Sequence, residues 1–319
     1  MFLASAIVFV NVITIQLLQI TTAEGLHINR RFPATDILHT PQRSMGTVVS
    51  KCPECDCRTN TRKKRIAGGT IAEENEFPWM AALKLTYRDR STSFCGATII
   101  TKQHVLTAAH CVDGYTAGQP IEAALGRHYQ KQRYERNEKI VGIKEIIRHP
   151  GFDFKSRSGN NDIAILKLNR TISFNIPQIQ PACLPSSENE DYVDNFGTVI
   201  GWGFTGDSIS TTNGIRKLEV PIIPTNDCRI NYSHRNASFS VTDNMMCAGG
   251  IKGQDTCMGD SGGPLQIDLD GLGTMKVVGI VSWGGGCSDE PDYPTVYTRI
   301  DRYKHWIHDN IGEECLCEI

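Results

Sequence analysis

About ten short runs of β-branched and other apolar residues follow residue 66, and glycine, proline, asparagine and aspartate fill the gaps between them. Short strands separated by such turn residues are typical of β-sandwiches and β-barrels. The runs cover residues 79–85, 97–100, 105–107, 139–147, 163–168, 198–200, 218–223, 265–267, 277–281 and 295–298. The period changes near the end of the chain, where apolar residues recur at helical spacing: Ile300, Tyr303, Trp306, Ile307 and Ile311. We therefore expect an all-β domain that closes with one amphipathic helix.

The 12 cysteines are too many for the reducing cytosol, and they predict disulfides in a secreted protein. Three of them, Cys52, Cys55 and Cys57, form a cluster that could also bind zinc, although a secreted context favours disulfides. Residues 66–319 contain the other nine, an odd number. If every thiol is oxidised within one chain, at least one bridge must join the cluster to residues 66–319.

The N-terminal residues predict export. Residues 2–20 are mostly apolar, and the small residues Thr21, Thr22 and Ala23 follow them. We expect a signal peptide over residues 1–23 and a secreted, extracellular protein. The alternative is an uncleaved membrane anchor, but two glutamines and an asparagine interrupt the apolar run and no basic cluster precedes it.

Neither charge nor hydropathy indicates a nucleic-acid or membrane partner for the rest of the chain. The formal net charge is only −2 at pH 7, which gives no electrostatic argument for binding to nucleic acid or to an anionic membrane. Beyond the N-terminal run, no stretch is apolar enough to span a bilayer.

A basic run, Arg62-Lys63-Lys64-Arg65, directly precedes an apolar, glycine-containing start at Ile66. Basic runs are usually solvated surface, but this abrupt change in composition indicates a processing site. Cleavage after Arg65 would separate a polar propeptide or light segment, residues 24–65, from a domain over residues 66–319. It would also free an α-amino group on Ile66. Both a trypsin-like protease and a convertase could cut there, so the identity of the activating protease stays open.

Three short sequences carry candidate chemistry. His110 follows an apolar run in Thr107-Ala108-Ala109-His110-Cys111, and Asp162 begins another in Asn161-Asp162-Ile163. Ser261 lies between small residues in Gly259-Asp260-Ser261-Gly262-Gly263. Taken singly, each residue has an ordinary structural explanation, as a core histidine, a turn aspartate and a loop serine. A serine hydroxyl is a weak nucleophile that needs a base and a charge-stabilising pocket.

Together, in the order His, Asp, Ser, these motifs closely resemble the chymotrypsin-like serine protease family, trypsin-like branch, from Ile66 to about Ile311. The resemblance implies two packed six-stranded antiparallel β-barrels with a catalytic cleft between them and a C-terminal helix. It implies that Ser261 attacks the peptide carbonyl, His110 transfers the proton, and Asp162 orients the imidazole. The backbone N–H groups of Gly259 and Ser261 would form the oxyanion hole.

The resemblance also implies an activation step. The Asp260 carboxylate would pair with the new amino group of Ile66, and a buried carboxylate without its partner is strongly disfavoured. We therefore expect the uncleaved chain to be an inactive precursor. Ala67 stands where the family usually has valine, a departure that leaves the Ile66 amine intact.

Substrate preference is expected to depend on two distant residues. Asp255, six residues before Ser261, matches the pocket floor that selects arginine or lysine in trypsin-like members. Thr295 stands where those members have glycine, so the alternative is a restricted or elastase-like preference. The pocket wall and the segment that pairs with substrate backbone match Ser282, Trp283 and Gly284.

The resemblance implies the bridges Cys95–Cys111, Cys228–Cys247 and Cys257–Cys287, and a bridge from Cys183 to the light segment at Cys57. The remaining cysteines can pair in three ways: Cys52, Cys55, Cys315 and Cys317. A bridge within Cys-x-Cys would be strained, which favours bridges from the light segment to the C-terminal tail. Three sequons predict surface glycans: Asn169, Asn231 and Asn236.

No cofactor and no metal are expected. Arg127 stands where calcium-binding members have glutamate, and Pro294 resembles members that bind no regulatory sodium. The expected partners are protein or peptide substrates, an activating protease and protein protease inhibitors. The rival hypothesis is a catalytically inactive homologue that acts by binding, and the intact set of His110, Asp162 and Ser261 argues against it.

Overall fold

The structure is a computed structural model. It describes residues 52, 55–59, 69–115, 119–130, 135–153, 159–205, 208–211, 213–234, 240–251, 260–284 and 294–319. Several sequence predictions lie outside this part of the chain: the signal peptide over residues 1–23, Arg65, Ile66, Asn236, Asp255, Cys257, Gly259 and Cys287.

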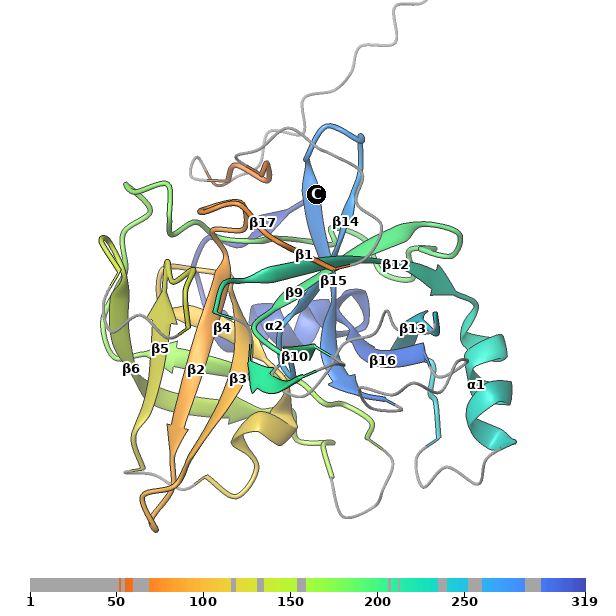
Figure 1. Cartoon of the computed structure of the whole chain (residues 1–319), viewed down its shortest axis with the longest axis horizontal. Helices are drawn as coiled ribbons and strands as arrows, with labels where there is room; N and C mark the ends of the chain where they lie inside the picture. The colour runs from red at the N-terminus through yellow and green to blue at the C-terminus, as the bar shows by residue number, and fades with distance from the viewer. Residues whose placement is uncertain are drawn as a thin grey trace, which may run out of the picture. The chain divides into compact units, whose positions relative to one another are not determined.

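The first half of the described chain forms a closed six-stranded barrel, in the order β2-β3-β4-β7-β6-β5 with antiparallel neighbours (Figure 1). Its strands are β2 (Met80–Thr86), β3 (Thr92–Ile99), β4 (His104–Thr107), β5 (Ile121–Leu125), β6 (Lys139–Arg148) and β7 (Ala164–Leu168). Strand β2 shows how the barrel encloses an apolar core: Leu83 and Leu85 are fully buried, while Lys84 between them is exposed. This period-two alternation gives the strand one apolar face.

The second half forms another six-stranded barrel, because β9 pairs with both β12 and β14 at the two ends of the row β12-β13-β16-β15-β14. Its strands are β9 (Phe196–Gly201), β12 (Arg216–Ile223), β13 (Met245–Gly249), β14 (Pro264–Asp268), β15 (Met275–Trp283) and β16 (Pro294–Arg299). The prediction of two six-stranded antiparallel barrels is confirmed. Strand β1 (Thr70–Ile71) adds to β12, and β10 (Phe204–Thr205) pairs with β11 (Ser208–Thr211).

Helices are few among the described residues. The predicted closing helix is present as a 3-10 turn, η2 (Ile300–Tyr303), that continues into α2 (Lys304–Ile311). Gly312, with φ of 67°, follows its last residue. The sequence analysis missed α1 (Thr225–Ser233), which starts directly after Pro224, and the single turn η1 (Ala109–Val112).

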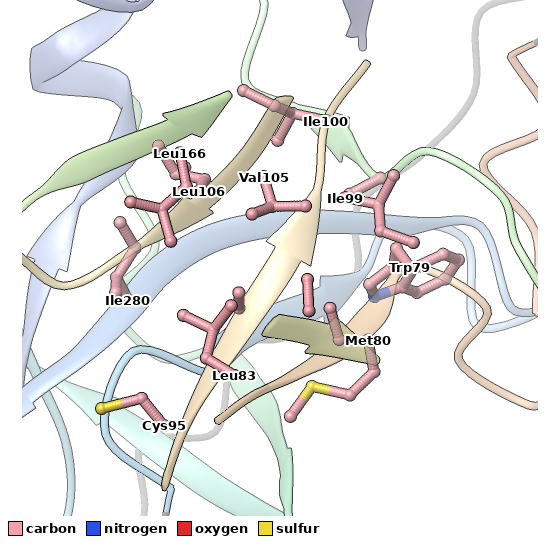
Figure 2. Close-up of a cluster of buried hydrophobic side chains, with 14 of the residues drawn as sticks. Trp79, Met80, Leu83, Cys95, Ile99, Ile100, Val105, Leu106, Leu166 and Ile280 are labelled. Carbon is pink, nitrogen blue, oxygen red and sulfur yellow. The ribbon is translucent and has the colours of Figure 1, made fainter. Parts of the chain in front are cut away.

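The two barrels share buried contacts. Ile280 of β15 lies among first-barrel side chains that include Leu83 and Leu106 (Figure 2). The indole of Trp79, just before β2, donates a 2.7 Å hydrogen bond to Gln266 Oε1 in β14, and both residues are buried. These contacts hold the two barrels against each other, so side chains from both barrels can contribute to one site.

Three disulfides join the light segment to the domain: Cys52–Cys315, Cys55–Cys317 and Cys57–Cys183. The bridge from Cys183 to Cys57 was expected, and so were bridges from the light segment to the C-terminal tail; which of the two tail cysteines each light-segment cysteine binds was left open in the sequence analysis. The tail strand β17 (Cys317–Glu318) lies parallel to β8 (Cys183–Leu184), so two of the bridges leave neighbouring backbone positions. The bridges Cys95–Cys111 and Cys228–Cys247 are also present, and no described cysteine is free.

In the described residues, no helix combines the length and the apolar character needed to cross a membrane.

The two bridges to the C-terminal tail should contribute to stability in a strongly non-additive way. While one bridge remains, the other closes only a small ring, so replacing either cysteine pair by serine should cost about 2 kcal/mol of unfolding free energy. Removing both pairs also opens the long loop that runs through Cys57–Cys183 and should cost about 7 kcal/mol. Urea unfolding of the oxidised variants measures these losses; a combined loss of only about 4 kcal/mol would contradict the prediction.

Candidate active site

His110 and Asp162 meet beside the first barrel. His110 lies in η1, just after β4, and Asp162 lies two residues before β7. One carboxylate oxygen of Asp162 lies 2.7 Å from His110 Nδ1, and the other accepts the backbone N–H of His110 at 2.8 Å. The carboxylate thus orients the ring and favours a proton on Nδ1. In the neutral histidine, the lone pair on Nε2 is then free to accept a proton from the hydroxyl group of a nucleophile.

The second barrel completes the surroundings of Asp162. The hydroxyl of Ser282 in β15 donates at 2.6 Å to Asp162 Oδ2, the carboxylate oxygen that also contacts His110 Nδ1. The hydroxyl of Thr298 in β16 donates to the backbone carbonyl of Asp162 at 2.8 Å. Asp162 is only 3% exposed, so the bonds from His110 and Ser282 satisfy a carboxylate charge that water cannot reach freely, while Thr298 satisfies the backbone carbonyl. The sequence analysis assigned Ser282 to substrate binding and missed both contacts, because residues far apart in the chain make them.

The electrostatic surroundings raise the pKa of His110. Burial lowers this pKa, but the charge of Asp162 and its hydrogen bond raise it, with a smaller contribution from Asp113, and the net pKa lies above the ordinary 6.5. An imidazole with such a pKa can accept a proton near neutral pH and then stabilise the resulting charge.

Close backbone contacts position the turn that contains Ser261. The carbonyl of Ser261 accepts the N–H of Gly96 in β3 at 2.7 Å. Gly262 has φ of 78°, and a Cβ there would lie 2.3 Å from Thr107 Oγ1. A Cβ on Gly96 would lie 2.7 Å from the Cα of Gly263. These glycines let the serine turn pack directly on β3 and beside the Cys95–Cys111 bridge, whose Cys111 directly follows His110 in the chain.

The carboxylate of Asp260 points away from this turn into a glycine-lined space. Gly203 donates its N–H to Asp260 Oδ1 at 2.9 Å, and Asp260 is 9% exposed. A Cβ would lie 1.9 Å from the carboxylate at Gly201 and 2.3 Å from it at Gly203. The sequence analysis named Asp260 but not these two glycines, for which the Gly-Trp-Gly spacing was the available signal.

The candidate substrate-binding residues that the structure describes lie together at the ends of β15 and β16: Ser282, Trp283, Gly284 and Thr295. A Cβ on Gly284 would lie 3.1 Å from the Cα of Thr295, which is itself 4% exposed. Trp283 packs edge-to-face on Tyr232 of α1, with ring centroids 4.9 Å apart. The Tyr232 hydroxyl donates to the carbonyl of Pro294 at 2.6 Å. Tyr232 thus joins the two strands, and the sequence analysis missed it.

Among the described residues, one group of three closely spaced metal-ligating side chains is present, Cys95, His110 and Cys111, and its two cysteines form a disulfide. In the loop between β5 and β6, Arg127 makes an ion pair with Glu138, whose side chain is 3% exposed. The two described sequon asparagines, Asn169 after β7 and Asn231 in α1, are exposed.

Comparisons with known proteins agree with this geometry. Residues 66–307 match the protein-family model described as Trypsin. The chain is 33% identical over 282 residues to CLIP domain-containing serine protease B4 of Anopheles gambiae, which covers 84% of this chain and 76% of that protein. Melanization protease 1 of Drosophila melanogaster is 34% identical over 294 residues, with 85% and 71% covered. Trypsin-1 of Astacus astacus is 35% identical over 248 residues, with 77% and 99% covered.

Replacing Asp162 by asparagine should reverse the pKa shift of His110. Without the carboxylate charge, burial dominates, so the pKa should fall below 6.5. In the unmodified protein the raised pKa stabilises the fold below pH 6.5, and this contribution is lost as the pH rises through the folded-state value. Histidine NMR titration measures the midpoint. Asp113→Asn is the matched control and should leave it above 6.5; a midpoint that stays raised in Asp162→Asn would contradict this assignment.

Proposed function

Because the chain belongs to the trypsin family of serine proteases, we propose that it is a secreted serine endopeptidase made as a zymogen. The observation that carries this proposal is the 2.7 Å contact between the buried Asp162 carboxylate and His110 Nδ1, beside the turn that presents Ser261. A carboxylate, an imidazole and a serine hydroxyl in this order supply the base and the nucleophile that peptide hydrolysis requires.

The proposed reaction has two stages. Nε2 of His110 takes the hydroxyl proton as Ser261 Oγ attacks the peptide carbonyl carbon, and Asp162 stabilises the imidazolium that forms. His110 then donates the proton to the leaving amine, and a water molecule, deprotonated in the same way, hydrolyses the acyl-enzyme. The backbone N–H groups of Ser261 and Gly259 would stabilise the carbonyl oxygen as it becomes negative.

Activation is proposed to follow cleavage after Arg65. The freed amino group of Ile66 would bind the Asp260 carboxylate, and the glycine-lined space at Gly201 and Gly203 supports this role because it excludes side chains around that carboxylate. An ion pair buried there would stabilise the turn that contains Ser261. The three disulfides of the light segment would keep it attached after cleavage.

We propose cleavage after arginine or lysine, selected by Asp255 as the pocket floor. A second candidate, a restricted or elastase-like preference, is supported by one observation: Thr295 is buried directly against Gly284. Peptides that differ only in the residue before the scissile bond distinguish the two. The partners would be protein substrates, an activating protease and protein protease inhibitors.

A chain with residues 61–65 replaced by four aspartates and a lysine allows enteropeptidase to free Ile66 without cutting at other basic residues. The cut protein should hydrolyse arginyl peptides and react with a serine-directed phosphonate, because the freed amino group of Ile66 can then bind the Asp260 carboxylate. The uncut protein should show only background rates. The cut protein with Ser261→Ala should lose at least about a thousandfold in kcat.

Absence of both hydrolysis and labelling in the cut protein would favour an inactive binding homologue. Full activity in the uncut protein would refute the zymogen proposal and leave the endopeptidase proposal intact.

A further inference from the structure

Asn161, the residue before Asp162, has an unusual backbone conformation. Its φ is 58°, in the left-handed region that asparagine tolerates better than most other residues with a side chain. Its carbonyl accepts the N–H of Ile163 at 2.8 Å, across Asp162. The backbone on both sides of Asp162 therefore turns tightly, so the direction of the carboxylate depends on how Asn161 is fixed.

The side chain of Asn161 contacts three separate segments. Its Nδ2 donates to the carbonyl of Gly151, after β6, at 2.9 Å. Its Oδ1 accepts the hydroxyl of Tyr303 in η2 at 3.0 Å and the Nδ2 of Asn244, just before β13, at 3.4 Å. One amide thus binds the first barrel through its donor and the second half of the chain through its acceptor.

Asn160, the residue before Asn161, also links the first half of the chain to the second. Asn160 Oδ1 accepts the hydroxyl of Thr242 at 2.9 Å and the same Asn244 Nδ2 at 3.2 Å. The carbonyl of Asn244 in turn accepts the N–H of Arg299 at 3.0 Å. Asn244 therefore contacts both asparagines while its own backbone is bonded to the end of β16.

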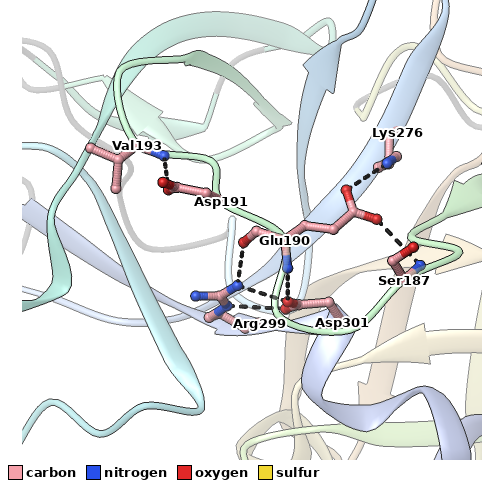
Figure 3. A network of polar contacts seen from close by, with 7 residues as sticks. All are labelled: Ser187, Glu190, Asp191, Val193, Lys276, Arg299 and Asp301. Atoms are coloured by element: carbon pink, nitrogen blue, oxygen red, sulfur yellow. Dashed lines mark hydrogen bonds and ion pairs between the residues drawn. The ribbon is translucent and has the colours of Figure 1, made fainter.

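Arg299 belongs to a partly buried polar network (Figure 3). Its guanidinium makes two hydrogen bonds to Asp301, at 2.7 and 3.0 Å, and Asp301 is fully buried. The carbonyl of Glu190 accepts a further bond from Arg299, and the Glu190 carboxylate binds Lys276 at 2.7 Å. Paired charges in a partly buried network have few alternative arrangements, so the segment to which Asn244 is bonded has little freedom to move.

We propose that Asn161 is a positioning residue for Asp162, fixing the direction of its carboxylate between the two barrels so that it meets His110 Nδ1. This inference rests on the proposed function and extends it beyond the three reacting residues. Misplacement of a catalytic group by about 1 Å can cost on the order of a hundredfold in rate. Loss of the Asn161 amide should therefore affect kcat rather than substrate binding.

The test compares Asn161→Gly with Asn137→Gly in the cut protein. Glycine keeps the left-handed backbone and removes the side chain, and Asn137 is an exposed asparagine with φ of 85° in a loop outside the site. Asn161→Gly should lower kcat at least tenfold with KM within twofold. Asn137→Gly should match the unmodified protein in both constants.

Titration gives a second readout that needs no activity. Among the described residues, Asp162 and Asp113 face His110, and Tyr303 faces Asp162. A displaced carboxylate would support the His110 charge less well, so the NMR midpoint of His110 and the acid limb of kcat/KM should both move to lower pH in Asn161→Gly. A merely structural role would lower the unfolding temperature and move neither.

An Asn161→Gly protein with unmodified kcat and an unmoved His110 midpoint would overturn the inference. If that variant does not fold, Tyr303→Phe removes one donor to Asn161 Oδ1, and the same readouts should move in the same direction by a smaller factor, about threefold in kcat; no movement overturns it equally. Failure of the unmodified cut protein to hydrolyse peptides would contradict the proposed function alone, because the His110 midpoint still tests the positioning.

Discussion

The buried carboxylate of Asp162 is the group on which the site depends. It binds the ring and the backbone of His110 from the first barrel and accepts the hydroxyl of Ser282 from the second. A buried charge is tolerated only when its hydrogen bonds are made, and here the donors come from both halves of the fold. Correct packing of the barrels and correct orientation of the imidazole are therefore linked. The shared apolar core and the bond from Trp79 to Gln266 keep the barrels in the arrangement that this carboxylate requires.

Glycine residues determine how closely the turn that contains Ser261 can pack against the first barrel. Gly96 and Gly263 bring two backbones into contact, while Gly201 and Gly203 leave the Asp260 carboxylate space that a side chain at either position would occupy. The lack of a side chain at these four positions is what allows this packing, because a side chain would displace either the turn or Asp260. The same turn thus packs on β3 through the backbone of Ser261 and directs the carboxylate of Asp260 into the space beside Gly201 and Gly203. This arrangement gives a physical reason why events at Asp260 could control the geometry at Ser261.

Much of the fold could be predicted from sequence, since each of the ten apolar runs overlaps a strand and the closing helix is present. Among the barrel strands, β5 and β13 were missed, because β5 contains two alanines and a glutamate and β13 ends in alanine and glycine, residue types that are depleted in strands. The contacts of Tyr232, Thr298 and Asn161 could not be predicted, because their partners lie far away in the chain. Cysteine parity required one bridge from the light segment, and the structure contains three.

The central claim is that the Asp162 carboxylate accepts hydrogen bonds from residues of both barrels. A double-mutant cycle tests this claim most directly. The unfolding free energy would be measured for Asp162→Ala, Ser282→Ala and the double variant at a pH where the carboxylate is ionised. A hydrogen bond to a buried charge predicts a coupling energy of about 1.5 kcal/mol or more between the two substitutions. Losses that add to within about 0.5 kcal/mol would contradict the account.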